Sequence, residues 1–181
     1  MRKCNADGID VPQILGSKST YGLGAFGGFK GRKLQAGDVL PVGIPSPRSR
    51  AGRKADATLL PMLSKEVELR VLTGIYYHRL QEESVQSLFA DTWTVGSEAD
   101  RIGYRFKGGT PLKFIEREPP FGAGADPSNI VDAGYPYGSI QMPGGKEPII
   151  LHRDAVSGGG YAMVGTVTRH RNDAIAHLLH L

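Results

Sequence analysis

Cysteine is almost absent from this chain, because Cys4 is the only one in 181 residues. A single cysteine excludes a disulfide within the chain, so we expect the reducing environment of the cytoplasm. Long apolar runs are missing as well, since no stretch reaches the roughly 18 residues that a membrane-spanning helix needs. The first residues, MRKCNADG, carry no apolar signal core. We therefore expect a cytoplasmic protein that does not enter a membrane.

Charge of one sign is also in short supply, since the net charge is only +4. Much of the basic excess lies in residues 45–54, PSPRSRAGRK, which contain no aromatic side chain. Proteins that bind single-stranded nucleic acids combine a basic groove with aromatic rings on which the bases stack. The segment is therefore better explained as a solvent-exposed loop, and we expect no nucleic-acid partner.

The usual ligands of a metal site are lacking too. Three histidines, His170, His177 and His180, lie near the C-terminus, but no cysteine or carboxylate pattern completes a ligand set around them. We expect no metal cofactor. Surface positions, two of them on a short helix over residues 172–181, explain these histidines more simply.

Glycine and proline, by contrast, are abundant, with 25 and 12 residues. They mark turns, so they predict many short strands rather than a helical bundle. Only residues 80–91 (LQEESVQSLFAD) show the apolar spacing of an internal helix, with glutamates near its start. The pattern predicts a mainly β fold, a barrel or a sandwich with one or two flanking helices. Strands are predicted at residues 8–15, 66–72, 93–95, 101–106, 138–142, 148–151 and 161–167, with a turn leading into a strand at 34–43 and a long loop at 119–137.

A proline-, serine- and arginine-rich stretch over residues 45–57 is the best candidate for a boundary between subdomains. We therefore expect residues 1–57 to form a partial N-terminal subdomain with one strand and a glycine-rich segment. Residues 58–181 are expected to form the main β subdomain.

The candidate site lies in residues 147–165, EPIILHRDAVSGGGYAMVG. A short apolar strand runs into His152, Arg153 and Asp154, and alternation past the strand end lets one of the last two face a cavity. Three glycines at 158–160 remove side chains that would crowd a ligand, and they expose backbone N–H donors beside Tyr161. A glycine-rich hairpin braced by an Asp–Arg pair would explain the same residues equally well.

Three longer segments carry a resemblance to a known family. They are GSKSTYGLGAFGGFKGRKLQAGDVLPVG at 16–43, SEADRIGYRFKG at 97–108 and GSIQMPGGKEPIILHRDAVSGGGYAMVGTV at 138–167. In this order they resemble the allophanate hydrolase subunit 2 or KipA-like family, which includes one of the subunits of bacterial 5-oxoprolinase and the carboxyltransferase domain of urea amidolyase. The resemblance also implies a chain truncated at both ends, because the portion ahead of the first motif and the final Pro-Gly turn and strand are absent.

The resemblance implies a fold, a function and a set of partners. The fold is a cyclophilin-like β-barrel. The function is that of a subunit or domain of a biotin-dependent carboxyltransferase or ATP-dependent amidohydrolase acting on urea, allophanate or 5-oxoproline. Carboxybiotin from a partner domain, or ATP in the complex, is the implied cofactor, and a KipI-like (allophanate hydrolase subunit 1) protein or fused domain is the implied partner. The alternative is a non-catalytic, KipI-binding regulatory protein.

The family motifs also imply residue roles at the matching positions. Asp154 is the catalytic candidate, which would accept hydrogen bonds from a substrate N–H and help to remove its proton. Gln141 would recognise the amide, and Ser19, Thr20 and Arg101 would hold a carboxylate or bicarbonate. The other substrate-binding candidates are Arg153, Ser157, Gly159, Gly160 and Tyr161.

Overall fold

The computed structural model describes residues 8–44, 52, 54–56, 58 and 64–168. They belong to two compact units, unit 1 within residues 1–60 and unit 2 within residues 61–181. The helix predicted at 172–181 lies outside the described residues, as does the histidine at position 170.

Unit 1 consists of turns around one short hairpin. Its strands β1 (Thr20–Tyr21) and β2 (Phe26–Gly27) pair antiparallel. After the hairpin, the guanidinium of Arg32 donates to both carboxylate oxygens of Asp38, at 2.8 and 2.7 Å, and this pair holds the two ends of the turn between them. The turn predicted within residues 34–43 is confirmed, but the strand predicted after it does not form.

The strand predicted over residues 8–15 is also wrong. Two isolated bridges replace it, and one of them joins Ile14 to Ser17 within a tight turn. Leu15 and Gly16 take positive φ angles of 49° and 77° in this turn, a conformation that ends an extended segment.

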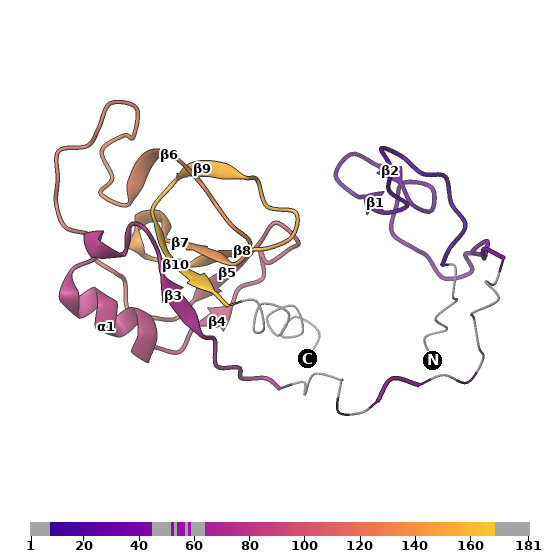
Figure 1. The fold of residues 1–181 in the computed structure, drawn as a ribbon, viewed down its shortest axis with the longest axis horizontal. Helices are drawn as coiled ribbons and strands as arrows, with labels where there is room; N and C mark the ends of the chain where they lie inside the picture. Colours follow the sequence, from indigo (N-terminus) through magenta and orange to yellow (C-terminus); the bar gives the residue numbers. More distant parts are fainter. Residues whose placement is uncertain (1–7, 45–51, 53, 57, 59–63, 169–181) are drawn as a thin grey trace. The chain divides into compact units, whose positions relative to one another are not determined.

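Unit 2 is built on one open antiparallel sheet of six strands (Figure 1). A separate antiparallel pair consists of β6 (Asn129–Gly134) and β9 (Gly158–Tyr161). No sheet closes on itself among the described residues, so the mainly β class is confirmed and the predicted barrel is not. Across the six-stranded sheet the order is β3 (Val71–Thr73), β10 (Met163–Val167), β7 (Ser139–Gln141), β8 (Ile149–Leu151), β5 (Gly103–Lys107) and β4 (Thr94–Val95).

Strand β8 shows that the sheet is buried on both faces. Ile150 packs into the main hydrophobic cluster, which also contains Leu88. Its neighbours Ile149 and Leu151 point the other way and pack with Tyr135 in a second cluster. A strand covered on both faces reads as a continuous apolar run, which explains the sequence of β8.

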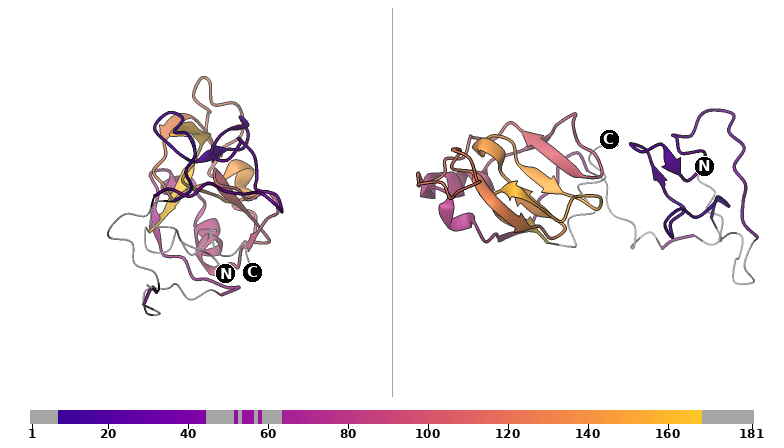
Figure 2. Two further views of the ribbon diagram at one scale, coloured as in Figure 1. Left: turned by 90° about the vertical axis from the view of Figure 1, so that its right-hand side faces the viewer. Right: turned by 90° about the horizontal axis from the view of Figure 1, so that it is seen from above.

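Helix α1 (Glu82–Ala90) confirms the internal helix predicted from sequence spacing. Glu82 and Glu83 lie in its first turn, where the positive end of the helix dipole favours acidic side chains. Its buried Ser84 accepts a hydrogen bond from the backbone N–H of Lys113 at 2.7 Å. In Figure 1, α1 and the β6–β9 pair lie on opposite sides of the central strands, and Figure 2 shows α1 at one end of the unit.

The other strand predictions for unit 2 had mixed outcomes. The hairpin predicted around residues 96–100 is confirmed, because β4 pairs with β5. Of the strand predicted at 66–72, only Val71 and Leu72 belong to a strand, in β3, which pairs with β10. The predicted loop at 119–137 contains β6, which pairs with the triple-glycine segment in β9.

Among the described residues, no helix combines the length and apolar character needed to cross a membrane.

Close approach of strands requires a glycine at position 74. A Cβ atom added to Gly74 would lie 2.4 Å from the carbonyl oxygen of Met163 and 2.7 Å from the nitrogen of Gly165. We expect Gly74→Ala to lower the free energy of unfolding by about 1–3 kcal/mol, because the contacted atoms are backbone and cannot rotate away. Urea unfolding, followed by the fluorescence of the single tryptophan, measures this change.

Gly134→Ala is the matched control, because its added Cβ would meet no atom closer than 3.8 Å. We expect a change within about 0.5 kcal/mol for this variant. Equal losses in the two variants would contradict the packing explanation.

Candidate functional site

Two hollows among the described residues of unit 2 differ in character. The larger, the edge groove, holds ≈ 750 Å³, is mostly apolar, and contains none of the predicted site residues. The smaller, the turn cavity, holds ≈ 290 Å³ and contains two of them, Arg153 and Ser157. We therefore take the turn cavity as the candidate site. Its lining residues are Tyr135, Pro136, Tyr137, His152, Arg153, Ala155 and Ser157.

Backbone hydrogen bonds at the end of β8 hold the walls of the turn cavity. The N–H of His152 donates to the carbonyl of Ile102 at 2.9 Å, and the N–H of Ala155 turns back to the carbonyl of His152 at 3.2 Å. The N–H of Tyr135, another lining residue, donates to the carbonyl of Ser157 at 2.9 Å. The tight turn after β8 and the segment after β6 are thus held together.

One wall of the cavity is aromatic and carries a cation. The Tyr137 hydroxyl lies 3.2 Å from Nε2 of His152, and the imidazole packs edge-on against Tyr104 with ring centroids 5.1 Å apart. The guanidinium carbon of Arg153 lies 4.9 Å from the Tyr137 ring centroid, within the range of a cation–π contact. This wall presents planar, hydrogen-bonding groups suited to a small planar polar ligand.

Asp154 lies beside the turn cavity but does not line it. Its carboxylate accepts two hydrogen bonds from the guanidinium of Arg101, from Nε at 2.6 Å and from Nη2 at 3.0 Å. These hydrogen bonds hold the pKa of the Asp154 carboxyl below its ordinary value, and burial opposes them only partly. A carboxylate with a lowered pKa is a weaker base, so the geometry favours hydrogen-bond acceptance over proton removal.

The triple glycine is a strand and not an open loop beside the cavity. Gly159 pairs with Ala133 of β6, and a Cβ atom added to Gly159 would lie 3.1 Å from the ring of Tyr135. A Cβ atom on Gly160 would lie 3.3 Å from the carbonyl oxygen of Ile130. The missing side chains allow β6 and Tyr135 to approach, a role that the sequence interpretation did not foresee.

The Tyr135 hydroxyl connects β9 to the buried amide of β7. It lies 2.6 Å from the carbonyl oxygens of both Gly159 and Tyr161, and it accepts a hydrogen bond from the N–H of Tyr161 at 3.0 Å. Burial raises the pKa of Tyr135, while hydrogen bonds from Tyr161 and from the side chain of Gln141 counteract this rise. Gln141 is therefore placed behind the cavity wall, where it acts on Tyr135.

The predicted site residues thus fall into separate places. Arg153 and Ser157 share the turn cavity, Asp154 and Arg101 form the neighbouring ion pair, and the remaining predicted residues of unit 2 lie on β7 and β9. Ser19 and Thr20 belong to unit 1, and a role for them stays a prediction.

Sequence reasoning missed two aromatic residues of the cavity, Tyr135 and Tyr137. Both fall in the segment predicted as a long loop, where no periodic pattern marked them. The triplet YPY immediately before Gly138 is the one signal that could have drawn attention to them. Within the described part of the chain, no group of three His, Cys, Asp or Glu side chains is arranged to hold a metal ion.

Comparison with known sequences identifies related proteins. The sequence pattern of the family described as "Carboxyltransferase domain, subdomain A and B" matches residues 4–180. Urea amidolyase of Lachancea kluyveri is 35% identical over 171 residues, which cover 88% of this chain and 9% of that protein. A 5-oxoprolinase subunit of Escherichia coli K12 is 31% identical over 162 residues, covering 90% of this chain and 47% of that protein.

Solved structures give the same relationship. The urea amidolyase of K. lactis matches with a TM-score of 0.83 at 34% identity, over 96% of this chain and 11% of that chain. The structure of TTHA0988 matches with a TM-score of 0.67 at 28% identity, over 94% of this chain and 29% of that chain. The chain therefore spans less than half the length of each of these relatives.

The ion pair between Arg101 and Asp154 predicts a measurable titration. We expect Arg101→Gln to raise the pKa of Asp154 toward the ordinary value of about 3.9, because the two guanidinium hydrogen bonds are lost. Carboxyl-carbon NMR titration of Asp154 measures this change. Since the pKa is lowered in the folded protein, the pair stabilises the fold above the ordinary pKa, and its contribution is lost as pH falls through the lowered value.

Arg105→Gln is the matched control, since Arg105 is a half-buried arginine of β5 that forms its ion pair with Glu98, at 3.8 Å. The pKa of Asp154 should stay unchanged in this variant. An Asp154 pKa that is the same in both variants and in the unmodified chain would show that the ion pair does not form in solution.

Proposed function

The chain belongs to the family of carboxyltransferase domains, subdomains A and B, and on that premise we propose that it is a component of an enzyme complex acting on a small amide. Urea, allophanate and 5-oxoproline are the proposed substrates. The observation that carries the proposal is the turn cavity, which at ≈ 290 Å³ is close in size to the smallest ligand pockets. Two relatives, by their names a urea amidolyase and a 5-oxoprolinase subunit, support the same substrate class.

Arg153 and Ser157 are the proposed contacts for the substrate oxygen. The Arg153 guanidinium is planar and stacks on Tyr137, so its donors are held in one orientation at the cavity wall. Ser157 is exposed and also lines the cavity, and its hydroxyl can both donate and accept hydrogen bonds. A flat amide presents a C=O acceptor and N–H donors, and these two side chains with the Tyr137 hydroxyl match that pattern.

Asp154 lies beside the cavity and does not line it, so it is the proposed acceptor for a substrate N–H at the cavity mouth. An ionised carboxylate can accept about four hydrogen bonds, and Arg101 occupies two of these positions. If Asp154 keeps its ion pair with Arg101 while it binds the substrate, the pair holds the carboxylate ionised and in a fixed orientation. In this arrangement Arg101 positions Asp154, and Gln141 positions the cavity wall through Tyr135.

Of the two implied cofactors, carboxybiotin and ATP, carboxybiotin fits the turn cavity better. When bound, it would supply the carboxyl group that is transferred. The cavity offers a cation and hydroxyl groups to a small planar headgroup, whereas its lining contains no helix N-terminus, a common binding place for phosphate groups. We therefore assign ATP to another part of the complex. A KipI-like protein or fused domain is the proposed partner, consistent with the small share of each relative that the chain covers.

The test reconstitutes the chain with a KipI-like partner and measures ATP-dependent turnover of urea and of 5-oxoproline. We expect Arg153→Gln to lower kcat/KM about 10- to 100-fold, because a hydrogen bond to a charged group contributes about 1.5–3 kcal/mol. Arg105→Gln is the control, since it removes the same charge from a residue that pairs with Glu98 and does not line the turn cavity, and it should leave turnover unchanged.

The same assay tests Asp154. Asp154→Ala should also reduce turnover, and undiminished turnover in this variant would remove Asp154 from the proposed site. One observation favours the non-catalytic alternative: the Asp154 carboxylate is already committed to an ion pair. Binding of the KipI-like partner that is unaffected by Asp154→Ala, without any amide turnover, would favour a regulatory protein.

A further inference from the structure

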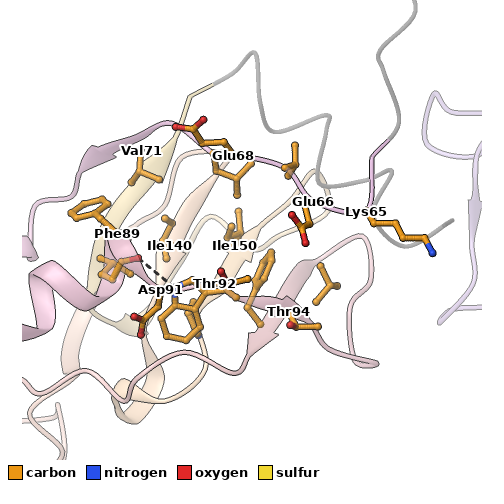
Figure 3. Close-up of a pocket in the computed structure, with 17 residues that line it drawn as sticks. Lys65, Glu66, Glu68, Val71, Phe89, Asp91, Thr92, Thr94, Ile140 and Ile150 are labelled. Atoms are coloured by element: carbon orange, nitrogen blue, oxygen red, sulfur yellow. Dashed lines mark hydrogen bonds between the residues drawn. The ribbon is translucent and has the colours of Figure 1, made fainter.

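The edge groove lies between the two edges of the six-stranded sheet. One side of the groove is lined by the start of β3 and the segment before it, residues 65–69 and Val71. The other side is lined by β4 and the segment before it, residues 91–95. These are the first and last strands in the sheet order. Figure 3 shows Glu68 and Val71 on one side of the groove, Asp91 and Thr94 on the other, and the core side chains between them. The sheet therefore bends until its two free edges face the same hollow.

On both outer strands of the sheet, some backbone groups have no hydrogen-bond partner among the described residues. On the β3 side, the carbonyl of Arg70 accepts from Thr168 and the N–H of Gly74 donates to Val164, so even-numbered residues face β10. Odd-numbered residues, including Leu69, consequently direct their N–H and C=O groups away from β10. No backbone hydrogen bond joins residues 67 and 69 to any other described residue.

The β4 side has the same arrangement. The N–H of Gly96 donates to the carbonyl of Arg105 at 2.7 Å, so Gly96 faces β5. Trp93 and Val95 therefore direct their backbone groups away from β5, toward the open side of the strand. As far as the described residues show, both outer edges of the sheet are available for pairing with a further strand.

Most side chains that line the edge groove are apolar, and several belong to the main hydrophobic cluster. Burial alternates along residues 66–71, with Val67, Leu69 and Val71 half-buried and the residues between them exposed. The floor is formed by Ile140 and Ile150 of the main hydrophobic cluster. A partner with an apolar side chain at every second position would cover this surface in the register of a strand.

Charge at the rim favours a basic occupant. Glu66 and Glu68 line the groove, and neither forms an ion pair with another described residue. Asp91 adds a third carboxylate, held by the N–H of Thr110 at 2.6 Å, and Lys65 is the one opposing charge in the lining. Lysine or arginine side chains between the apolar positions of an incoming strand would meet these carboxylates.

We propose that the edge groove accepts an extended strand of a partner polypeptide, with alternating aliphatic and basic side chains, which pairs with the free edge at residues 65–71. A small apolar ligand would instead bury the edge N–H and C=O groups without partners, at a cost of about 1–3 kcal/mol for each group. A strand satisfies these groups and covers the apolar floor together. This proposal does not depend on which reaction the turn cavity supports.

The test uses the whole chain and a synthetic seven-residue peptide in which valine and lysine alternate. Trp93, the single tryptophan, lines the edge groove and reports binding by its fluorescence. We expect a saturable change in this fluorescence, and at least tenfold slower hydrogen exchange at the amides of Val67 and Leu69. The same peptide with N-methylated valines keeps its side chains but loses the N–H donors, so it should bind at least tenfold more weakly.

Leu69→Glu should weaken peptide binding at least tenfold, because it places a carboxylate on the apolar face of the free edge. Leu72→Glu is the matched control: Leu72 lies three residues further along, is 65% exposed and does not line the groove. The N-methylated peptide keeps the test decisive if Leu69→Glu alters folding.

Three results would overturn the proposal. Equal binding of the two peptides would show a site for apolar ligands rather than for a strand. Protection of the Val67 and Leu69 amides without peptide, rising with protein concentration, would assign the edge to a second copy of the chain. Absence of any saturable change in Trp93 fluorescence would show that the groove takes no strand.

Discussion

Burial of β8 on both faces is the constraint on which the rest of unit 2 depends. Ile150 needs α1 and the main cluster on one side, and Ile149 and Leu151 need the Tyr135 cluster on the other. Burying apolar surface contributes roughly 25 cal/mol per Å², so neither face can be left open without a large loss. The β6–β9 pair is the element that brings Tyr135 over the second face, and the turn cavity forms where this cover meets the end of β8.

The candidate site is therefore a consequence of how the second face is covered. Tyr135 packs on Gly159, joins β9 through its hydroxyl, and contributes a wall of the cavity. The turn after β8 places Arg153 in the cavity and Asp154 outside it, in the ion pair with Arg101. The same backbone that completes the core thus positions the polar groups available for chemistry.

Local patterns made part of this structure predictable. Helix α1 was found because apolar spacing and acidic residues at its start are properties of a few consecutive residues. The β4–β5 hairpin was found because its turn joins two neighbouring strands. Arg153 was a candidate because it stands in a charged cluster after an apolar strand, and Ser157 was implied by the family resemblance; both line the turn cavity. Tyr135, Tyr137 and β6 were not found, since the strand that pairs with β6 lies about thirty residues away in the sequence.

The sequence by itself determined the mainly β class, the single internal helix and the family resemblance, because each depends on spacing within short segments. Only the tertiary structure decided that the triple glycine is a strand, that Arg101 pairs with Asp154 across 53 positions, and that two free sheet edges border one groove. Hydrogen bonds and packing between distant segments set these features. Residue order alone does not reveal which distant backbone groups will meet.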